Sequence, residues 1–348
     1  MNSKIYLFFV WSDFHLLICK NIIKSKNLNS VDCYFKVDRN VKLEDGDIIL
    51  PSILEDFQKK RILVRPLFYL FNKKRIDSLL KGKKLEVFYP FVLSYTYRSF
   101  CKINYFEEGF SSYITNCSPS KISKFSRLKS LIVFHLVNFF FKGEALKSFV
   151  GNFCFSDGSP SEKIDIYTIS PYAFSSFNNP LINKIVLDVS WNVTTKYNIP
   201  YGSYLMVLDR FSEGGRPYSL SNYFKCLRRE LSYIQNNDVN KIWIKFHPAD
   251  ENKEELKFLF YDYVKDGTFT FVEFEGKLEY LAIQDAGISF IGTNSTILYY
   301  APLYGNTNKS ISFSRYLASI DSQYEEFMHL YGGIDGFVDI FSKNVECL

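Results

Sequence analysis

The chain alternates short apolar runs with stretches whose apolar residues recur every three or four positions. The runs KIYLFFVW at 4–11, LEVFYP at 85–90 and KIWIKF at 241–246 have the length and composition of buried strands. Between such runs lie helical patterns, for example FHLLICKNIIKSK at 14–26 and SNYFKCLRRELSYIQ at 221–235. Strands that alternate with helices predict parallel sheets with helices on their faces.

This alternation occurs twice along the chain. The first series includes VDCYFKV, DIILPS and KINYF, and the second begins at YLMVLD and continues through FTFVEF and GISFIG. Between the two series, roughly residues 156–200 contain SDGSPSEK, SPYAFSSFNNP and NIP, which we interpret as a loop-rich linker. We therefore predict two domains, 1–185 and 186–348, with the last helical segment packing back on the first domain.

Length and composition agree with two folded domains. A chain of 348 residues is long enough for two domains of roughly 150 residues each. With 47% hydrophobic and 23% charged residues, the sequence is not that of a disordered protein. The net charge of +5 favours anionic partners such as nucleotides or a phospholipid surface, but it is too small for a nucleic-acid-binding protein.

Cysteine and histidine usage bears on disulfides and metals. The seven cysteines form no C-x-x-C pair, so we predict neither a disulfide framework nor a zinc site, and expect reduced thiols in a cytosolic protein. Four histidines are too few for a multi-histidine metal site. The cysteines and histidines are Cys19, Cys33, Cys101, Cys117, Cys154, Cys226, Cys347, His15, His135, His247 and His329.

One acidic stretch matches a metal-binding sequence pattern. LEDGDIIL contains Glu44-Asp45-Gly46, and its Asp45-Gly46-Asp47 matches the metal-binding pattern D-x-D. Asp-Gly is a strong turn signal and a strand pattern follows at once, so we predict a structural turn here.

The longest apolar run, LIVFHLVNFFF at 131–141, is well short of the roughly 20 residues that span a bilayer. The apolar N-terminus lacks a small-residue cleavage site and is predicted to be a strand, not a signal peptide. Two interpretations of the run at 131–141 stay open: a buried core helix, or peripheral docking on an anionic membrane. Membrane docking would depend on the basic residues that flank the run, which are Lys121, Lys124, Arg127, Lys129 and Lys142.

Candidate site residues follow several predicted strands. In NYFEEGFSSY at 104–113, Glu107 and Glu108 come directly after a strand and before Gly109. A solvated turn is the structural interpretation, and a ligand-binding turn is the alternative. In KIWIKFHP, His247 and Pro248 lie just past a strand's carboxyl end, where open α/β sheets bind ligands. Pro248 fixes the turn, because proline cannot continue a sheet ladder.

A third candidate is GISFIGTNSTILYYA, where a strand ends at Gly292 and Asn294 or Ser295 is predicted to cap the next helix. Hydroxyls and free N–H groups at such a helix start suit a phosphate, although plain N-capping would explain them too. Glu279 begins the preceding apolar helix and either binds a ribose or interacts with the helix's positive end.

Together these motifs resemble the bacterial sialyltransferases, a group that includes lipooligosaccharide sialyltransferases and capsular polysialyltransferases. That family shares a D/E-D/E-G motif, an H-P motif and an S-S/T motif, which correspond in order to residues 107–109, 247–248 and 295–296. The opening VWSDFHLL at 10–17 also resembles the strand–helix start of that group. The resemblance covers most of the chain by order and spacing, with motifs of two or three residues each.

The two alternating halves and this resemblance imply the GT-B fold of glycosyltransferases, an α/β architecture of two Rossmann-like domains with a cleft between them. The resemblance further implies an inverting, metal-independent transfer of sialic acid from CMP-sialic acid. Glu107, the general base in the acceptor-side domain, and His247 would be the catalytic residues, with Glu108, Gly109 and Pro248 as supporting residues of the two motifs. In the C-terminal domain, the implied CMP-binding residues are His247, Glu279, Ser295 and Thr296, with Glu279 on the ribose.

The implied acceptor is a galactose- or sialic-acid-terminated glycan of lipopolysaccharide, O-antigen or capsule, made at the cytoplasmic face of the inner membrane, with possible peripheral membrane contact. No nucleic-acid partner and no cofactor are expected. Two alternatives remain. The chain could transfer another CMP- or CDP-activated group, such as Kdo or a polyol phosphate, although such enzymes typically have two histidine motifs and only His247 is well placed here. It could also be a non-catalytic polysaccharide-assembly protein.

Overall fold

The computed structural model divides into two compact units, Met1–Ser190 and Trp191–Leu348. The boundary predicted after residue 185 falls at the end of β7 (Ile182–Val186), the last strand of the first unit's sheet. The structure describes residues 4–37, 41, 43, 45–49, 78, 83–90, 102–113, 163–175, 180–188, 197–209, 217–237, 241–247, 257–258, 260–265, 267, 269–284, 287–304, 309–335 and 345–348.

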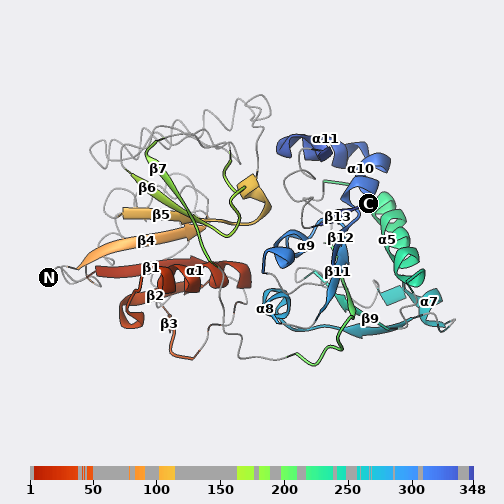
Figure 1. Cartoon of the computed structure of the whole chain (residues 1–348), viewed down its shortest axis with the longest axis horizontal. Helices are drawn as coiled ribbons and strands as arrows, with labels where there is room; N and C mark the ends of the chain where they lie inside the picture. Colours follow the sequence, from red (N-terminus) through yellow and green to blue (C-terminus); the bar gives the residue numbers. More distant parts are fainter. Residues whose placement is uncertain are drawn as a thin grey trace. The chain divides into compact units, whose positions relative to one another are not determined.

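The sheet of the first unit, sheet A, is parallel throughout, in the order β3-β2-β1-β4-β5-β6-β7 (Figure 1). Its centre is apolar, and the stacked rings of Phe8 and Phe88 lie 4.6 Å apart between neighbouring strands. Besides β7, the strands are β1 (Lys4–Val10), β2 (Cys33–Val37), β3 (Ile48–Ile49), β4 (Lys84–Pro90), β5 (Lys102–Phe106) and β6 (Ile164–Thr168).

The sheet of the second unit, sheet B, is also parallel, in the order β10-β9-β8-β11-β12-β13. In each sheet the strand order reverses beside the unit's first strand, which is the Rossmann arrangement. This confirms the predicted pair of Rossmann-like domains and, with it, the GT-B class; the cleft between them stays a prediction. The strands are β8 (Tyr204–Val207), β9 (Lys241–Lys245), β10 (Thr270–Glu273), β11 (Ser289–Gly292), β12 (Lys309–Ser312) and β13 (Glu346–Cys347).

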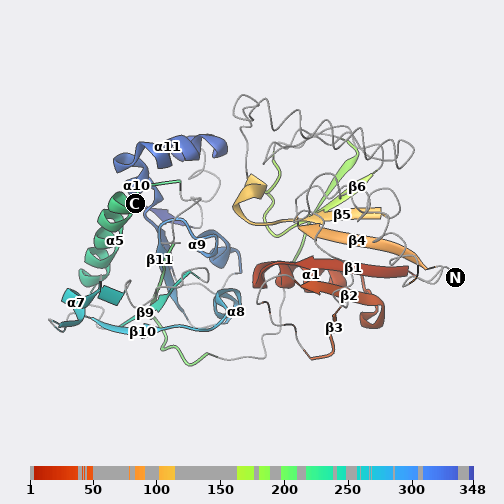
Figure 2. The ribbon, with the colours of Figure 1, turned by 180° about the vertical axis from the view of Figure 1, so that it is seen from behind.

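Helices cover both faces of sheet B, with α5 on one side and α8 and α9 on the other (Figures 1 and 2). The helices are α1 (Asp13–Ser25), α5 (Leu220–Gln235), α7 (Tyr261–Lys265), α8 (Leu278–Ile283), α9 (Ile297–Tyr300), α10 (Ser314–Ile320) and α11 (Ser322–Met328). Short 3₁₀ turns are η1 (Ser30–Asp32), η4 (Phe110–Tyr113), η6 (Ala301–Tyr304) and η7 (His329–Tyr331).

Helix α1 begins and ends for local reasons. The Ser12 hydroxyl accepts a 3.2 Å bond from the His15 N–H, which satisfies one donor of the first turn. Asp13 in the first turn and Lys24 in the last complement the helix dipole. The helix ends before Asn27, whose φ of 49° is left-handed.

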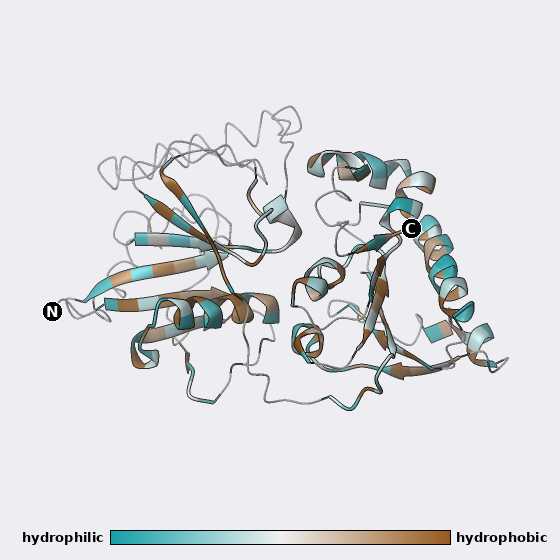
Figure 3. Ribbon diagram, viewed as in Figure 1, coloured by the Kyte–Doolittle hydropathy of each residue, from teal (hydrophilic) through white to brown (hydrophobic). Residues whose placement is uncertain are grey.

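Helix α5 is amphipathic, and in Figure 3 its surface alternates between hydrophobic and hydrophilic stretches. The Ser219 hydroxyl caps it by accepting from the Asn222 N–H at 3.3 Å. Its buried residues recur at helical spacing, and one of them is a glutamate, an exceptional occupant of a core position. These residues are Tyr223, Cys226, Leu227, Glu230, Leu231 and Ile234.

The interpretation of residues 156–200 as linker was wrong in part, because β6 and β7 lie within it. Strand β7 is an edge strand whose side chains are half-buried or exposed, so it lacks the continuous apolar run by which the central strands were predicted. At the other end of the chain, the two-residue β13 pairs with β12, and α10 packs against α5 of the same domain.

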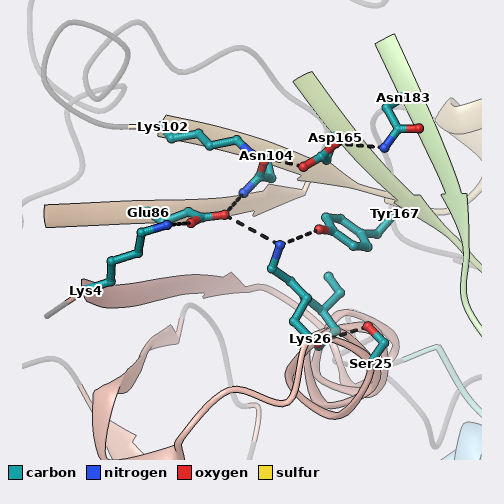
Figure 4. Close-up of polar contacts among 10 residues, drawn as sticks. Lys4, Ser25, Lys26, Glu86, Lys102, Asn104, Asp165, Tyr167 and Asn183 are labelled. Atoms are coloured by element: carbon teal, nitrogen blue, oxygen red, sulfur yellow. Dashed lines mark hydrogen bonds and ion pairs between the residues drawn. The ribbon is translucent and has the colours of Figure 1, made fainter. Parts of the chain in front are cut away.

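A buried polar cluster joins the end of α1 to sheet A (Figure 4). The carboxylate of Glu86 on β4 is buried and accepts a 2.7 Å bond from the Asn104 amide. Lys4 and Lys26 lie 3.5 and 3.8 Å from the same carboxylate, and the Lys26 amine donates to the Tyr167 hydroxyl at 3.1 Å. A buried charge requires such partners, so we interpret the cluster as structural.

Several predictions concern residues outside those that the structure describes. These are the apolar run at 131–141, its five flanking basic residues, His135, Glu44 and Pro248. No helix in the described part of the chain has the length and apolar character needed to cross a membrane. Of the described cysteines, Cys19, Cys33, Cys226 and Cys347 carry free thiols.

Candidate active site

The E-E-G turn follows β5 and gives its two glutamates different surroundings. Glu107 is 0% exposed, and its carboxylate accepts from the Tyr113 hydroxyl at 2.5 Å and from the Ile169 and Ser170 N–H groups at 2.7 and 3.5 Å. Glu108, by contrast, is half-buried. Because it is buried, Glu107 can contact a substrate only after a neighbouring group moves, whereas Glu108 already has partial access to solvent.

The turn itself depends on Gly109. This residue is buried and has a φ of 123°, a left-handed conformation that strongly favours glycine. The Ser112 N–H donates to the Gly109 carbonyl at 3.0 Å, and the Ser112 hydroxyl accepts from the Glu108 N–H at the same distance. The glycine of the motif is thus required by the backbone conformation of the turn.

A lysine lies near the buried glutamate. Lys184 on β7 donates to the Ala173 carbonyl at 2.9 Å and is within electrostatic reach of Glu107. Desolvation lowers the pKa of Lys184, and the negative charge of Glu107 partly opposes that shift. No sequence pattern associates these two residues, because Glu107 follows β5 and Lys184 lies on β7.

The opening segment of the chain meets the E-E-G turn. The Trp11 N–H donates to His15 Nδ1 at 3.2 Å, so the imidazole hydrogen is assigned to Nε2, which lies 3.4 Å from the Glu108 carbonyl and donates to it. Sequence reasoning gave His15 no role. Its position in the first helical turn after β1, at the carboxyl edge of the sheet, is the signal that could have found it.

In sheet B, His247 follows β9 as predicted and is half-buried. The end of β9 is fixed to its neighbour, because the Leu208 N–H donates to the Lys245 carbonyl at 3.0 Å. His247 therefore lies at the carboxyl edge of the sheet, next to the end of β8.

The S-T motif follows β11 at the same edge. The structure has Thr296 at the cap of α9, in place of the predicted Asn294 or Ser295, and Thr296 makes no side-chain capping bond. Ser295 and Thr296 are half-buried. Because the helix does not use the Thr296 hydroxyl as a cap, that hydroxyl can bind a ligand.

Asp209, which sequence reasoning missed, joins two strand ends at the point where the strand order of sheet B reverses. It follows β8, and its carboxylate accepts from the Asn294 N–H after β11 and from the Tyr218 hydroxyl, both at 3.3 Å. The reversal point of an open parallel sheet is where ligands bind. Only the pairing of β8 with β11 reveals that Asp209 lies there.

These placements bring part of the predicted site together. Strands β9 and β11 flank β8, so His247 and the S-T motif follow strand ends roughly 10 Å apart, since neighbouring strands are spaced by about 4.8 Å. Glu279 lies half-buried in the first turn of α8, which packs against η6, the continuation of α9. Glu107 and Glu108 belong to the carboxyl edge of sheet A.

The acidic stretch before β3 is a turn, as predicted. Gly46 has a φ of 93°, β3 begins two residues later, and Asp47 is ion-paired with Lys20. Within the described residues, no three His, Cys, Asp or Glu side chains are grouped so as to hold a metal ion.

Comparisons with known proteins give structural likenesses only. No family model matches the sequence, and no curated protein does. The UDP-GlcNAc 2-epimerase of Methanocaldococcus jannaschii, solved with UDP-GlcNAc and UDP, is 9% identical over 99% of this chain and 93% of that one, with a TM-score of 0.46.

Two further solved structures give similar values. WaaG, a glycosyltransferase involved in lipopolysaccharide biosynthesis, is 9% identical over 98% of this chain and 94% of its own, with a TM-score of 0.43. MurG of Acinetobacter baumannii is 11% identical over 99% and 85%, with a TM-score of 0.41. Likenesses of this degree do not assign an activity to the chain, whose fold class follows from its own sheet topology.

Proposed function

We propose that the chain is an inverting glycosyltransferase that moves sialic acid from CMP-sialic acid to a hydroxyl of a surface glycan, such as lipopolysaccharide, O-antigen or capsule. The observation that carries this proposal is the position of His247 and the S-T motif. Both follow strands that flank β8, at the carboxyl edge of a Rossmann-like sheet and beside its reversal point. That edge is where such sheets bind nucleotides.

In the proposed reaction, an acceptor hydroxyl oxygen attacks the anomeric carbon of sialic acid as the bond from that carbon to the phosphate oxygen breaks. A single displacement inverts the anomeric centre. The departing CMP keeps the electron pair of the broken bond, and His247 donates a hydrogen bond or a proton to its phosphate. Ser295 and Thr296 add hydroxyl donors to the same developing charge, and Glu279 binds the ribose.

The base that takes the acceptor's proton belongs to the E-E-G turn, and we propose Glu107 for it. Its anchoring by Tyr113 and two backbone N–H groups fixes the carboxylate at the carboxyl edge of sheet A, and the reaction requires it to exchange one donor for the acceptor hydroxyl. The half-buried Glu108 is the second candidate, because it needs no such exchange.

The decisive experiment incubates the protein with CMP-sialic acid and a panel of glycan acceptors, read by mass spectrometry, with CMP and UMP binding measured in parallel. Transfer of sialic acid, with CMP bound in preference to UMP, is the expected result. Transfer only from CMP-Kdo or a CDP-polyol would show that the donor is that compound and not CMP-sialic acid. A protein that binds no nucleotide would instead be an assembly protein without catalysis.

We further propose that the transfer needs no metal, since a departing monophosphate carries less charge than a diphosphate. The turn at residues 45–47 supports this, because one of its two aspartates is already ion-paired with Lys20. The transfer rate is therefore expected to survive EDTA. Complete loss in EDTA that magnesium or manganese restores would return Asp45 and Asp47 to consideration as metal ligands.

We also propose that the enzyme works at the cytoplasmic face of the inner membrane and docks there through the basic residues around 131–141. Each basic residue near an anionic leaflet contributes about 1 kcal/mol, and exposed charges are screened within about 10 Å at 0.1 M salt. Flotation with anionic liposomes is expected at low salt and not at high salt. Liposome binding that is unaffected by salt and also by the replacement of the five basic residues by serine would contradict this docking. These five residues are Lys121, Lys124, Arg127, Lys129 and Lys142.

A further inference from the structure

Helix α5 buries a carboxyl group that contacts Thr293, two residues before the S-T motif. Glu230 is 0% exposed, and the Thr293 hydroxyl donates to its Oε1 at 2.5 Å. The Cys226 thiol completes the contact, 3.8 Å from Glu230 Oε1 and 3.4 Å from the Thr293 hydroxyl. Among the described residues, Oε2 of Glu230 has no hydrogen-bond partner. A leucine could be buried at this core position without the desolvation free energy that a carboxyl group costs, so packing alone does not explain the glutamate.

The segment that begins at Thr293 is held from several sides. The Ser312 hydroxyl on β12 donates to the Thr293 carbonyl at 2.9 Å, and the Tyr324 hydroxyl on α11 donates to the Asn294 side-chain oxygen at 3.1 Å. In addition, the Asn294 N–H donates to the Asp209 carboxylate after β8, and the Thr293 hydroxyl donates to Glu230 on α5. Residues 293 and 294 are therefore held by β12, α11, α5 and the segment after β8. The next two residues, Ser295 and Thr296, are left half-buried at the sheet edge.

This environment favours the protonated carboxyl. Burial raises the pKa of Glu230 to about 8, the Thr293 hydrogen bond opposes that shift, and the nearby negative charge of Asp209 adds to it. The other titratable groups that face it, Cys226 and Tyr223 on α5, have pKa values raised mainly by burial and are uncharged near neutral pH. Within the described part of the chain, ionised Glu230 would have the Asp209 carboxylate as its charged neighbour and no cation beside it.

We propose that Glu230 is a positioning residue that fixes Thr293 and thereby presents Ser295 and Thr296 to the ligand at the edge of sheet B. The identity of that ligand, the phosphate of CMP, rests on the proposed function. The anchoring of the segment does not, so the two can be tested separately.

The anchoring is tested by amide hydrogen exchange of the ligand-free protein, read on the peptide that covers residues 293–298. Glu230→Leu and Thr293→Val are each expected to speed exchange there about tenfold, the scale of one lost buried hydrogen bond, and to leave peptides of β9 and β10 unchanged. Glu230→Gln keeps an acceptor for the Thr293 hydroxyl and is expected to behave as wild type at pH 6.5. The exposed Glu325→Gln on α11 is the matched control.

The pH dependence separates positioning from mere packing. The folded-state pKa lies near 8 against an ordinary value of 4.5, so the stability that neutral Glu230 contributes is full below about pH 4.5 and is lost as pH rises through about 8. At pH 8.5, wild type should therefore exchange faster in this peptide than Glu230→Gln, which cannot ionise. The melting temperature of wild type should also fall more than that of Glu230→Gln between pH 6 and 8.5.

CMP titration of the same variants tests the link to the ligand. At pH 6.5, Glu230→Leu and Thr293→Val should bind CMP about tenfold more weakly than wild type, and Glu230→Gln equally well. Wild-type exchange rates in Thr293→Val, or identical pH profiles for wild type and Glu230→Gln, would overturn the positioning role. If wild type binds no CMP, the proposed function fails, while the exchange data still decide what Glu230 does.

Discussion

Replacing Glu107 by glutamine is expected to lower the transfer rate by at least roughly 100-fold, the usual scale for a general base. The fold and CMP binding should persist. Glutamine has nearly the same volume, its carbonyl oxygen can accept from the Ile169 N–H, and its amide can donate to the Tyr113 oxygen. What it cannot do is take a proton. The measurement is the initial rate of sialic acid transfer, with CMP affinity and the melting temperature recorded for the same variant.

Two neighbouring substitutions serve as controls for this experiment. Glu108→Gln changes the half-buried carboxyl of the same turn, and Glu44→Gln changes the earlier E-D-G sequence. If Glu108→Gln is crippling and Glu107→Gln is mild, the base is Glu108, and the buried carboxyl only holds the turn together. If Glu44→Gln is the damaging change, the catalytic motif has been assigned to the wrong half of the first domain.

The His247→Ala variant should transfer sialic acid roughly 100- to 1,000-fold more slowly, the loss that follows removal of one donor to a developing negative charge. CMP should also bind more weakly, because the same side chain contacts the phosphate of the product. His247 lies past the end of β9 and is half-buried, so the substitution should leave sheet B intact. Steady-state rates and CMP titration measure the two effects separately.

The control for this variant is His329→Ala, which removes an exposed histidine on η7. Its activity and CMP affinity should match those of wild type. Unchanged activity in His247→Ala would remove the phosphate role from that residue and leave the S-T motif as the only proposed phosphate contact.

The central strands and the long helices could be predicted because their signals are local. Strands β1, β4, β8 and β11 are continuous apolar runs buried at the middle of their sheets, and α1 and α5 carry serine caps and helical spacing. The five-residue β6, whose sequence IDIYT includes polar residues, was also assigned to the linker. Strands β7 and β13 were missed because they lie at the edges of their sheets. Edge strands are short and partly exposed, and β13 has only two residues, so neither differs from a loop in composition.

The sequence by itself therefore determined the two-domain α/β class and the order of the three motifs along the chain. Tertiary structure alone decided the surroundings of each motif residue. The donor to the Glu107 carboxylate at Ile169 is 62 positions away, and the glutamate that holds Thr293 is 63 positions away. The physical reason is the parallel sheet, since its neighbouring strands are joined by long crossovers, which bring residues far apart in the sequence together at the carboxyl edge. Local patterns cannot reveal such contacts, because they form only once the sheet is assembled.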